Sequence, residues 1–417
     1  MLYVPSNYPS KFSSALHHAK APVDVLASHR SSLHWRAIRI ALALYATAAL
    51  IGAAVAAPAP LALTAAQQLA IERSPQMAAY DSEIAAARNT SLALVRSPVP
   101  ATKLGVGYLP VEDVDRLGVV QQPTGVEGRQ ALAERYARQG DLAAAQKTAT
   151  RVDIIRETAL AWLDCYYIER MTRIAADQLK AAQVELEGAE TTYWAGRLSQ
   201  ADFYAARSVL VMSEDKSSEL DHRARNARIT LTRWVGDAGD APLAALPNVD
   251  RIPLRSAALE GDLARHPEVV LLEKQEDVAA SDVRVARANG QLAPEIALML
   301  ARRDEARAAR DEKLRAKVAE MRIMIDEWQH ARDRRDRHAR ELVPLARERT
   351  RATLVAYRGG KASLTDVLAA RRAESEAQMQ SVEMEREAGR IWARIDFALP
   401  ETLPTAPSRS SRQESAR

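Results

Sequence analysis

Tyr193-Trp-Ala-Gly196-Arg-Leu-Ser199-Gln-Ala-Asp202 has a second copy in this chain, Tyr357-Arg-Gly-Gly360-Lys-Ala-Ser363-Leu-Thr-Asp366, which follows 164 residues later. Each copy leads into the same Ala-Ala-Arg triplet, at residues 205–207 and 369–371, so seven positions match at one constant offset. A looser match pairs residues 63–77 with 254–269, and a proline stands near the end of each stretch. Self-similarity at a fixed offset predicts two homologous structural units.

The repeated stretches divide the chain into two halves. We assign residues 57–240 to the first half and 254–400 to the second. A linker, 241–253, joins them within a stretch rich in Gly, Pro and Asp. The remaining residues, 401–417, are rich in Ser, Arg and Pro, and we expect a disordered tail there.

Both halves have the apolar spacing of long helices. In the first half, Val152, Ile155, Ala159, Trp162 and Tyr166 follow one another at steps of three and four. No proline interrupts 129–192, which predicts a helix of about 95 Å. Returning helices are predicted at 208–234 and 367–399, and a shorter one of about 80 Å at 303–356. The predicted fold class is therefore mainly α, with long antiparallel coiled-coil-like helices in two homologous halves.

The two repeated stretches lie between such helices and read as the tips of helical hairpins. We name residues 193–202 the first tip and residues 357–366 the second tip. Gly196 and Gly360 can take the left-handed conformation that closes a helix. Ser199 and Ser363 can cap the next helix, with Asp202 and Asp366 three residues later, as in a capping box. Capping accounts for most of the pattern, so a functional role of these residues would be additional.

One part of the first half, 103–121, has the pattern of a short β-hairpin. Its two runs, KLGVGYL and RLGVVQ, are six or seven residues long and flank a turn. Two short strands are not stable alone, so they would have to join strands from elsewhere.

The charge distribution excludes a phosphate-binding surface and points to export. The net charge of +4 arises entirely within residues 1–60, and the remaining acids and bases balance. A nucleic-acid partner would need a basic stripe, which is absent. Arg36 and Arg39 precede an uncharged run, 40–57, that ends in small residues. This is typical of a signal peptide, here 1–56 with an extended basic region and cleavage after Ala56. An uncleaved anchor helix is the alternative.

The sequence contains no constellation of catalytic or metal-binding residues. Four of the eight His lie before residue 57, and the other four lack metal-ligand spacing. Cys165, the one cysteine, has no Cys or His beside it. No phosphate-binding glycine loop or nucleophile elbow occurs. We therefore predict that the chain is not an enzyme and carries neither cofactor nor metal.

The duplication, the signal sequence, the strand pair and the tip motif together resemble the TolC-like outer-membrane efflux proteins. Four stretches are most similar to the heavy-metal branch, the CzcC/CusC-like channels. These stretches are Tyr108-Leu-Pro-Val-Glu-Asp, Thr158-Ala-Leu-Ala-Trp-Leu-Asp-Cys-Tyr-Tyr, Arg322-Ile-Met-Ile-Asp-Glu-Trp and Leu342-Val-Pro-Leu-Ala-Arg-Glu-Arg-Thr. The resemblance covers about residues 61–400.

The resemblance implies a homotrimer in the outer membrane of a Gram-negative bacterium. Each protomer of the family gives four strands to a shared β-barrel and its helices to a periplasmic α-barrel tunnel. The tips, with Tyr193, Gly196, Ser199, Asp202, Tyr357, Gly360, Ser363 and Asp366, would face a periplasmic adaptor and an inner-membrane pump. By motif position, Asp366 would line the constriction of the pore. One copy per protomer would attract cations to the axis.

The chain departs from the family pattern in its second half. Where a second strand hairpin is expected after Pro294, residues 296–300 run directly into Arg302-Arg-Asp-Glu. We therefore expect that hairpin to be missing. The strands of the first hairpin are also shorter than the 9–11 residues that a membrane strand needs. Two functions remain open: a passive exit duct of a tripartite efflux system, carrying heavy-metal cations, or a periplasmic helical scaffold that forms no conducting pore.

Overall fold

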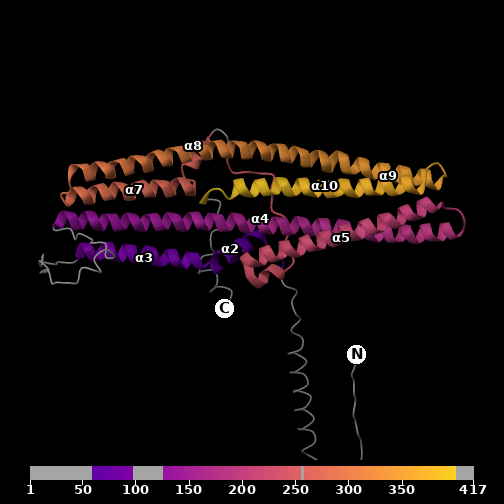
Figure 1. Cartoon of the computed structure of the whole chain (residues 1–417), viewed down its shortest axis with the longest axis horizontal. Coiled ribbons are helices and arrows are strands. Elements are labelled where there is room, and N and C mark those ends of the chain that lie inside the picture. Colours follow the sequence, from indigo (N-terminus) through magenta and orange to yellow (C-terminus); the bar gives the residue numbers. More distant parts are fainter. Residues whose placement is uncertain (1–58, 97–124, 255–257, 401–417) are drawn as a thin grey trace, which may run out of the picture. The chain divides into compact units, whose positions relative to one another are not determined.

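The computed structural model describes residues 59–96, 125–254 and 258–400, and regular structure there is helical (Figure 1). The elements of the first half are α2 (Leu63–Arg73), α3 (Pro75–Arg96), α4 (Val126–Trp194), α5 (Gln200–Val235) and the short 3₁₀-helix η2 (Gly236–Asp240). Those of the second half are α6 (Leu259–Leu263), α7 (Pro267–Ala288), α8 (Ala293–Arg337), the π-turn η4 (His338–Leu342), α9 (Val343–Arg358) and α10 (Leu364–Asp396). The mainly α fold class with long antiparallel helices is confirmed.

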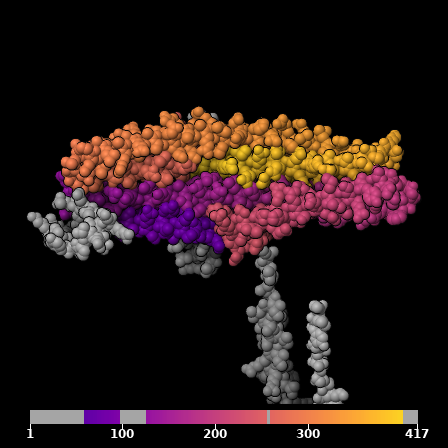
Figure 2. Space-filling model, in the orientation of Figure 1, coloured from indigo at the N-terminus to yellow at the C-terminus, as the bar shows by residue number. Residues whose placement is uncertain are grey.

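Helix α4 is the centre of the bundle. Its N-terminal part packs between α3 and α7, and its C-terminal part packs between α5 and α10 (Figure 1). Polar contacts join α4 to both helices of the second half: Arg135 pairs with Asp282 of α7, and Gln178 accepts a 2.6 Å hydrogen bond from Ser375 of α10. Helix α8 covers the far side of α7 and α10, and Figure 2 shows side chains filling the space between these ribbons.

The two halves have closely matching helices. Helices α3 and α7 both contain 22 residues and both begin with a proline, Pro75 and Pro267. Helix α4 has 69 residues, and its counterpart α8–η4–α9 is built from consecutive segments of 45, 5 and 16 residues. The prediction of a short second-half helix over 303–356 is therefore wrong. That helix begins at Ala293, so the apolar run 296–300 forms part of its first turns.

The long helix of the second half contains one irregularity, the π-turn η4. Pro344 follows it as the second residue of α9. A proline inside a helix has no N–H to donate and its ring clashes with the carbonyl four residues earlier. One wider turn removes this conflict without ending the helix. The prediction of a helix over 303–356 did not include this wider turn.

Between α7 and α8 the chain makes a four-residue turn, Asn289–Leu292. Gly290 has φ +66° there, and the N–H of Gln291 donates to the Ala286 carbonyl at 3.0 Å, which closes α7. The corresponding connection of the first half, 97–124, lies outside the described residues, and with it the strand hairpin predicted at 103–121. The predicted signal peptide, 1–56, and the predicted tail, 401–417, also lie outside them.

Two tryptophans form hydrogen bonds from the middle of the bundle to two non-helical segments, the residues before α2 and the linker. The indole of Trp162 on α4 donates to the Leu61 carbonyl at 3.0 Å, and that of Trp392 on α10 donates to the Arg251 carbonyl at 2.9 Å. Leu61 in turn forms an isolated parallel bridge with Leu243. The largest apolar core gathers around these contacts. The linker 241–253 therefore lies against the core, and the described residues from 59 to 400 belong to one compact unit.

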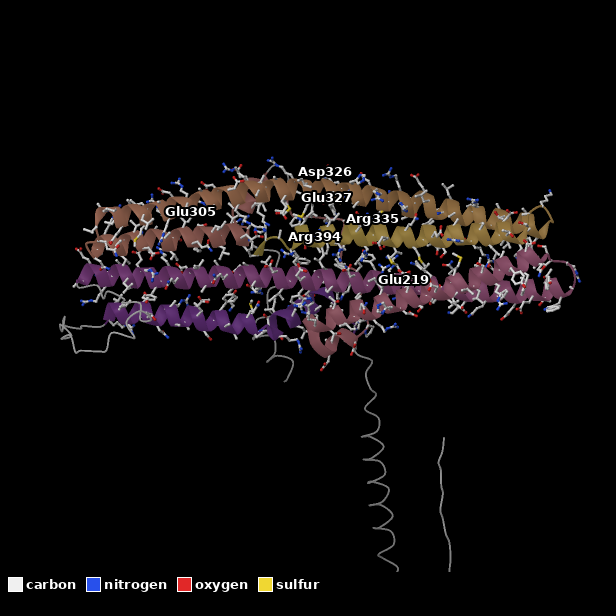
Figure 3. The ribbon with its side chains drawn as sticks, in the orientation of Figure 1. Glu219, Glu305, Asp326, Glu327, Arg335 and Arg394 are labelled. Carbon is white, nitrogen blue, oxygen red and sulfur yellow. The ribbon has the colours of Figure 1, made fainter. Side chains whose placement is uncertain are left out.

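Charged side chains project along the full length of the helices, among them Glu219, Glu305 and Asp326 (Figure 3). Many pair with a neighbour on the same helix, as exposed helical charges commonly do. In the described part of the chain, no helix has the length and apolar character to cross a membrane.

Candidate functional site

The first tip is a helix end closed by a left-handed glycine. Gly196 has φ +71°, and its N–H donates to the Tyr193 carbonyl at 2.9 Å. The N–H of Arg197 donates to the Thr192 carbonyl at 3.0 Å. These two bonds satisfy carbonyls that the end of α4 would otherwise leave without partners, in the arrangement of a Schellman motif.

The second tip repeats this geometry bond for bond. Gly360 has φ +70°, and its N–H donates to the Tyr357 carbonyl at 3.0 Å, while Lys361 donates to the Ala356 carbonyl at 2.8 Å. The glycine role predicted from the sequence is present at both tips. The two hairpins, α4–α5 and α9–α10, end at the same end of the bundle (Figure 1).

Ser363 and Asp366 form a complete capping box at the start of α10. The Asp366 N–H donates to Ser363 Oγ at 3.1 Å, and the Ser363 N–H donates to Asp366 Oδ2 at 2.9 Å. These hydrogen bonds, first from the backbone and then from the hydroxyl of Ser363, lower the pKa of Asp366 below its usual 3.8. Asp366 is exposed and therefore carries a full negative charge at neutral pH.

Ser199 and Asp202 form the cap of the first tip differently. The Asp202 N–H donates to Ser199 Oγ at 3.1 Å, and the Ser199 hydroxyl donates to Asp202 Oδ2 at 2.7 Å. The other carboxylate oxygen, Oδ1, accepts a 2.7 Å bond from the hydroxyl of Thr365 in the second tip. The two tips are thus bonded to each other. The internal repeat could not show this, because Thr365 aligns with Ala201, which has no hydroxyl.

Small and large apolar side chains alternate between the two tips. Leu364 and Leu368 of α10 pack against Ala189 of α4 and Ala206 of α5, and Tyr357 lies at the margin of this cluster. The small residues let the two hairpins approach closely. On the first tip, the Tyr193 ring stacks on Phe203 with centroids 5.1 Å apart.

An ion pair crosses from one hairpin to the other just behind the tips. Arg371 of α10 pairs with Glu185 of α4, beside a cavity of about 220 Å³ that Leu198 and Leu354 also line. Burial raises the pKa of Glu185, and the nearby Arg371 charge opposes this shift. Arg371 belongs to the repeated Ala-Ala-Arg triplet, and this repeat is the only feature of the sequence that marks it. No feature of the sequence marks Glu185 as its partner.

Away from the tips, the residues that could carry chemistry are few. Cys165 is buried, and burial raises its thiol pKa to about 12, so it is not a nucleophile at neutral pH. Within the described ranges, no group of three or more His, Cys, Asp or Glu is arranged to hold a metal ion. The tips are therefore the candidate functional site.

The chain is similar to solved structures of membrane proteins, among them outer-membrane channels. A membrane protein from Pseudomonas aeruginosa has a TM-score of 0.67 with 14% identity, over 83% of this chain and 92% of its own. The outer-membrane channel OprN has a TM-score of 0.66 with 16% identity, over 82% and 91%. CusC, whose structures describe transmembrane channel formation, has a TM-score of 0.65 with 13% identity, over 81% and 92%.

These similarities show that the chain shares the long-helix fold of these proteins, as the sequence predicts. They do not single out the heavy-metal branch, because CusC is no more similar to the chain than OprN is. No family model and no curated protein sequence matches the chain.

Proposed function

We propose that this chain is the outer-membrane channel of a tripartite efflux system and acts as a passive exit duct without catalysis. The observation that carries the proposal is the pair of bonded tips at one end of two long helical hairpins. The fold that presents them is shared with OprN and CusC over more than four fifths of the chain. In this proposal the working form is a homotrimer, and the tips meet a periplasmic adaptor and an inner-membrane pump.

Asp366 is the proposed constriction residue. Its carboxylate is exposed, its low pKa keeps it charged, and its capping bonds fix its position at the tip. In a trimer, three such charges around one axis would draw cations toward the opening and disfavour anions. Heavy-metal cations are the proposed cargo. The support for this choice is that charge together with the sequence resemblance to the CzcC/CusC-like channels.

The test separates the charge of Asp366 from its capping role. Asp366→Ala removes both, whereas Ser363→Ala removes the hydroxyl that caps Asp366 N–H and keeps the carboxylate. In planar bilayers, we expect Asp366→Ala to lower the cation-to-anion permeability ratio about twofold or more, with the trimer retained. Ser363→Ala should leave the ratio close to that of the parent. An equal effect of both variants, or none, would leave Asp366 only a helix cap.

A second candidate function is a periplasmic helical scaffold that forms no conducting pore. The four-residue turn Asn289–Leu292 favours it, because the second half has no hairpin at the position where the resemblance expects one. Membrane fractionation of the expressed chain discriminates the two functions. A trimer that only detergent releases supports the duct, whereas a protein released by salt or osmotic shock supports the scaffold.

A further inference from the structure

A pocket opens where the linker lies against the long helices, in the middle part of the bundle near Arg335 (Figure 3). Its volume is about 380 Å³, within the range of about 300–1,000 Å³ that is usual for sites of small organic ligands. We name it the linker pocket. Its wall includes Tyr167 of α4, linker residues 246–250, Arg335 of α8, Ala339 of η4 and Glu385 of α10.

The wall of the linker pocket contains a tyrosine whose hydroxyl has no partner. Tyr167 is 1% exposed, yet its hydroxyl forms no hydrogen bond within the described part of the chain. A buried tyrosine hydroxyl usually has a partner, because a buried polar group without one is unfavourable. Burial, together with the nearby Glu385 carboxylate, raises the pKa of Tyr167. The hydroxyl therefore keeps its proton and is available as a donor to a molecule in the pocket.

The charged side chains of the wall already have partners. Arg335 pairs with Asp250 at 2.6 Å and with Asp336 at 2.8 Å. Glu385 pairs with Arg170 of α4. A charged ligand would have to break one of these pairs or remain unpaired in a partly buried place, and both are unfavourable. The wall therefore favours an uncharged ligand.

Most of the remaining wall is apolar. Leu246, Pro247 and Val249 of the linker line one part of it, and Ala339 of η4 lines another. The amide of Asn248 is partly engaged, since its Oδ1 accepts the N–H of Asp250 at 3.0 Å. An apolar body can lie against these side chains. A hydroxyl group on that body can accept a hydrogen bond from a tyrosine and donate its own proton to a carboxylate.

From these observations we propose that the linker pocket binds a small uncharged molecule of the phenol or alcohol class, with the Tyr167 hydroxyl donating to the oxygen of the ligand. The competing occupant is water, which would satisfy the hydroxyl but leave the apolar side chains without a partner. The proposal goes beyond the duct and does not depend on it, because residues of one chain form the pocket at a distance from the tips.

The experiment measures ligand binding to the purified full chain by equilibrium dialysis. The probe is naphthol, which carries one hydroxyl on a flat apolar body. Methylnaphthalene has the same body without a hydrogen-bonding group, and naphthoate has it with a negative charge. We expect naphthol to bind about fivefold more tightly than methylnaphthalene, the difference of about one hydrogen bond. Naphthoate should bind more weakly than naphthol, since its charge would find no free cation in the wall.

Two pairs of variants test the residues of the wall. Tyr167→Phe removes the hydroxyl and keeps the ring, and Tyr166→Phe is the matched control at a position that does not line the pocket. We expect Tyr167→Phe to weaken naphthol binding about fivefold and to leave methylnaphthalene binding unchanged. Ala339→Phe places a ring in the pocket and should abolish binding of both probes. Ala352→Phe, at an exposed position of α9, should bind both like the parent.

Three outcomes would overturn the proposal. Equal naphthol binding by the parent and by Ala339→Phe would place the bound molecule elsewhere. Equal effects of Tyr167→Phe and Tyr166→Phe would show that the buried hydroxyl does not contact the ligand. No binding of naphthol to the parent would leave water as the occupant. Each of these results would leave the proposed duct standing, because that function is tested by the permeability of the Asp366 variant.

Discussion

At the scale of single residues, each tip depends on one glycine, and only its backbone conformation disfavours another residue there. An added Cβ at Gly196 or Gly360 would meet no atom within 4 Å, so space is available. A residue with a Cβ would instead pay for the positive φ, which costs it about 1 kcal/mol. The neighbouring Gly359 has φ −86° and carries no such constraint.

Gly360→Ala should therefore destabilise the chain by about 1 kcal/mol and lower its melting temperature by roughly 2 °C. It should also lower trimer yield, because the second tip would be distorted. Gly359→Ala is the matched control, since its Cβ would make ordinary contacts of 3.5 Å and beyond. Scanning calorimetry and a trimer assay check both. Equal effects of the two substitutions would contradict the role assigned to φ at Gly360.

Most of the tip geometry could be predicted from these residues alone. Glycine closes a helix and serine with an acid three residues later caps the next one, and both rules act within one short stretch. The contacts between the tips were beyond prediction. Thr365 meets Asp202 and Arg371 meets Glu185 only because two distant hairpins end side by side, and neither pair is related by the internal repeat.

At the scale of elements, the ends of α7 and α10 carry two titratable groups with opposite shifts. His266 caps α7 by accepting the Glu268 N–H at Nδ1, 3.2 Å away, and this requires the neutral ring. Burial, together with the Lys317 charge, lowers the pKa of His266 from 6.5 to about 4. Burial raises the pKa of Asp396, at the end of α10, from 3.8 to about 6.

The two groups should affect stability in opposite directions as the pH changes. Between pH 6.5 and about 4, unfolded His266 binds a proton that the folded ring refuses, so its contribution is lost as the pH falls. Folded Asp396 holds its proton up to about pH 6, whereas the unfolded carboxyl loses it near 3.8, so its effect is unfavourable as the pH rises. Between about pH 4 and 6, the two groups therefore change the free energy of unfolding in opposite directions.

Removing one group should expose the slope of the other. His266→Asn keeps a capping side chain without titration, and relative to the parent it should gain stability as the pH falls from 6.5 to 4, by up to about 3 kcal/mol. Asp396→Asn should show the reverse, gaining relative stability as the pH rises from 4 to 6. Denaturant melts at several pH values measure both differences. Parallel pH profiles of parent and variants would contradict the assignment.

The elements themselves were partly predictable. Periodicity located α4 to within three residues at each end, and α10 likewise, because long amphipathic patterns are strong signals. The start of α8 was missed, since residues 296–300 are apolar on all sides and lack helical periodicity. The signal that could have found the turn before it is Asn289-Gly290, a common turn dipeptide.

At the scale of the whole molecule, α5 and α9 form margins of the bundle and carry exposed apolar side chains. Val211 and Met212 are exposed on α5, and Leu345 and Val355 are exposed on α9. Helix α5 packs mainly on α4, and α9 packs mainly on α10, so each keeps an open side. For the proposed homotrimer, we expect the α5 margin of one protomer to meet the α9 margin of the next, because such head-to-tail contacts can close into a ring.

Val211→Glu should therefore reduce the trimer fraction strongly, because it would bury an unpaired charge in each of three contacts. Val184→Glu is the control, since Val184 is exposed on the central helix α4 and not on a margin. Sedimentation velocity in detergent distinguishes trimer from monomer. A similar loss of trimer in both variants, or in neither, would contradict this arrangement.

The near-equal helices of the two halves have a consequence for where the two tips stand. Removal of a connecting segment from a helical hairpin is tolerable only if both flanking helices keep their lengths, because any change would shift every downstream contact along the bundle. Here α3 and α7 each contain 22 residues. Helix α4 contains 69 residues, and its counterpart consists of three consecutive segments, α8, η4 and α9, of 45, 5 and 16 residues. With the short turn at Gly290, both tips therefore stand at the same level at one end of the bundle.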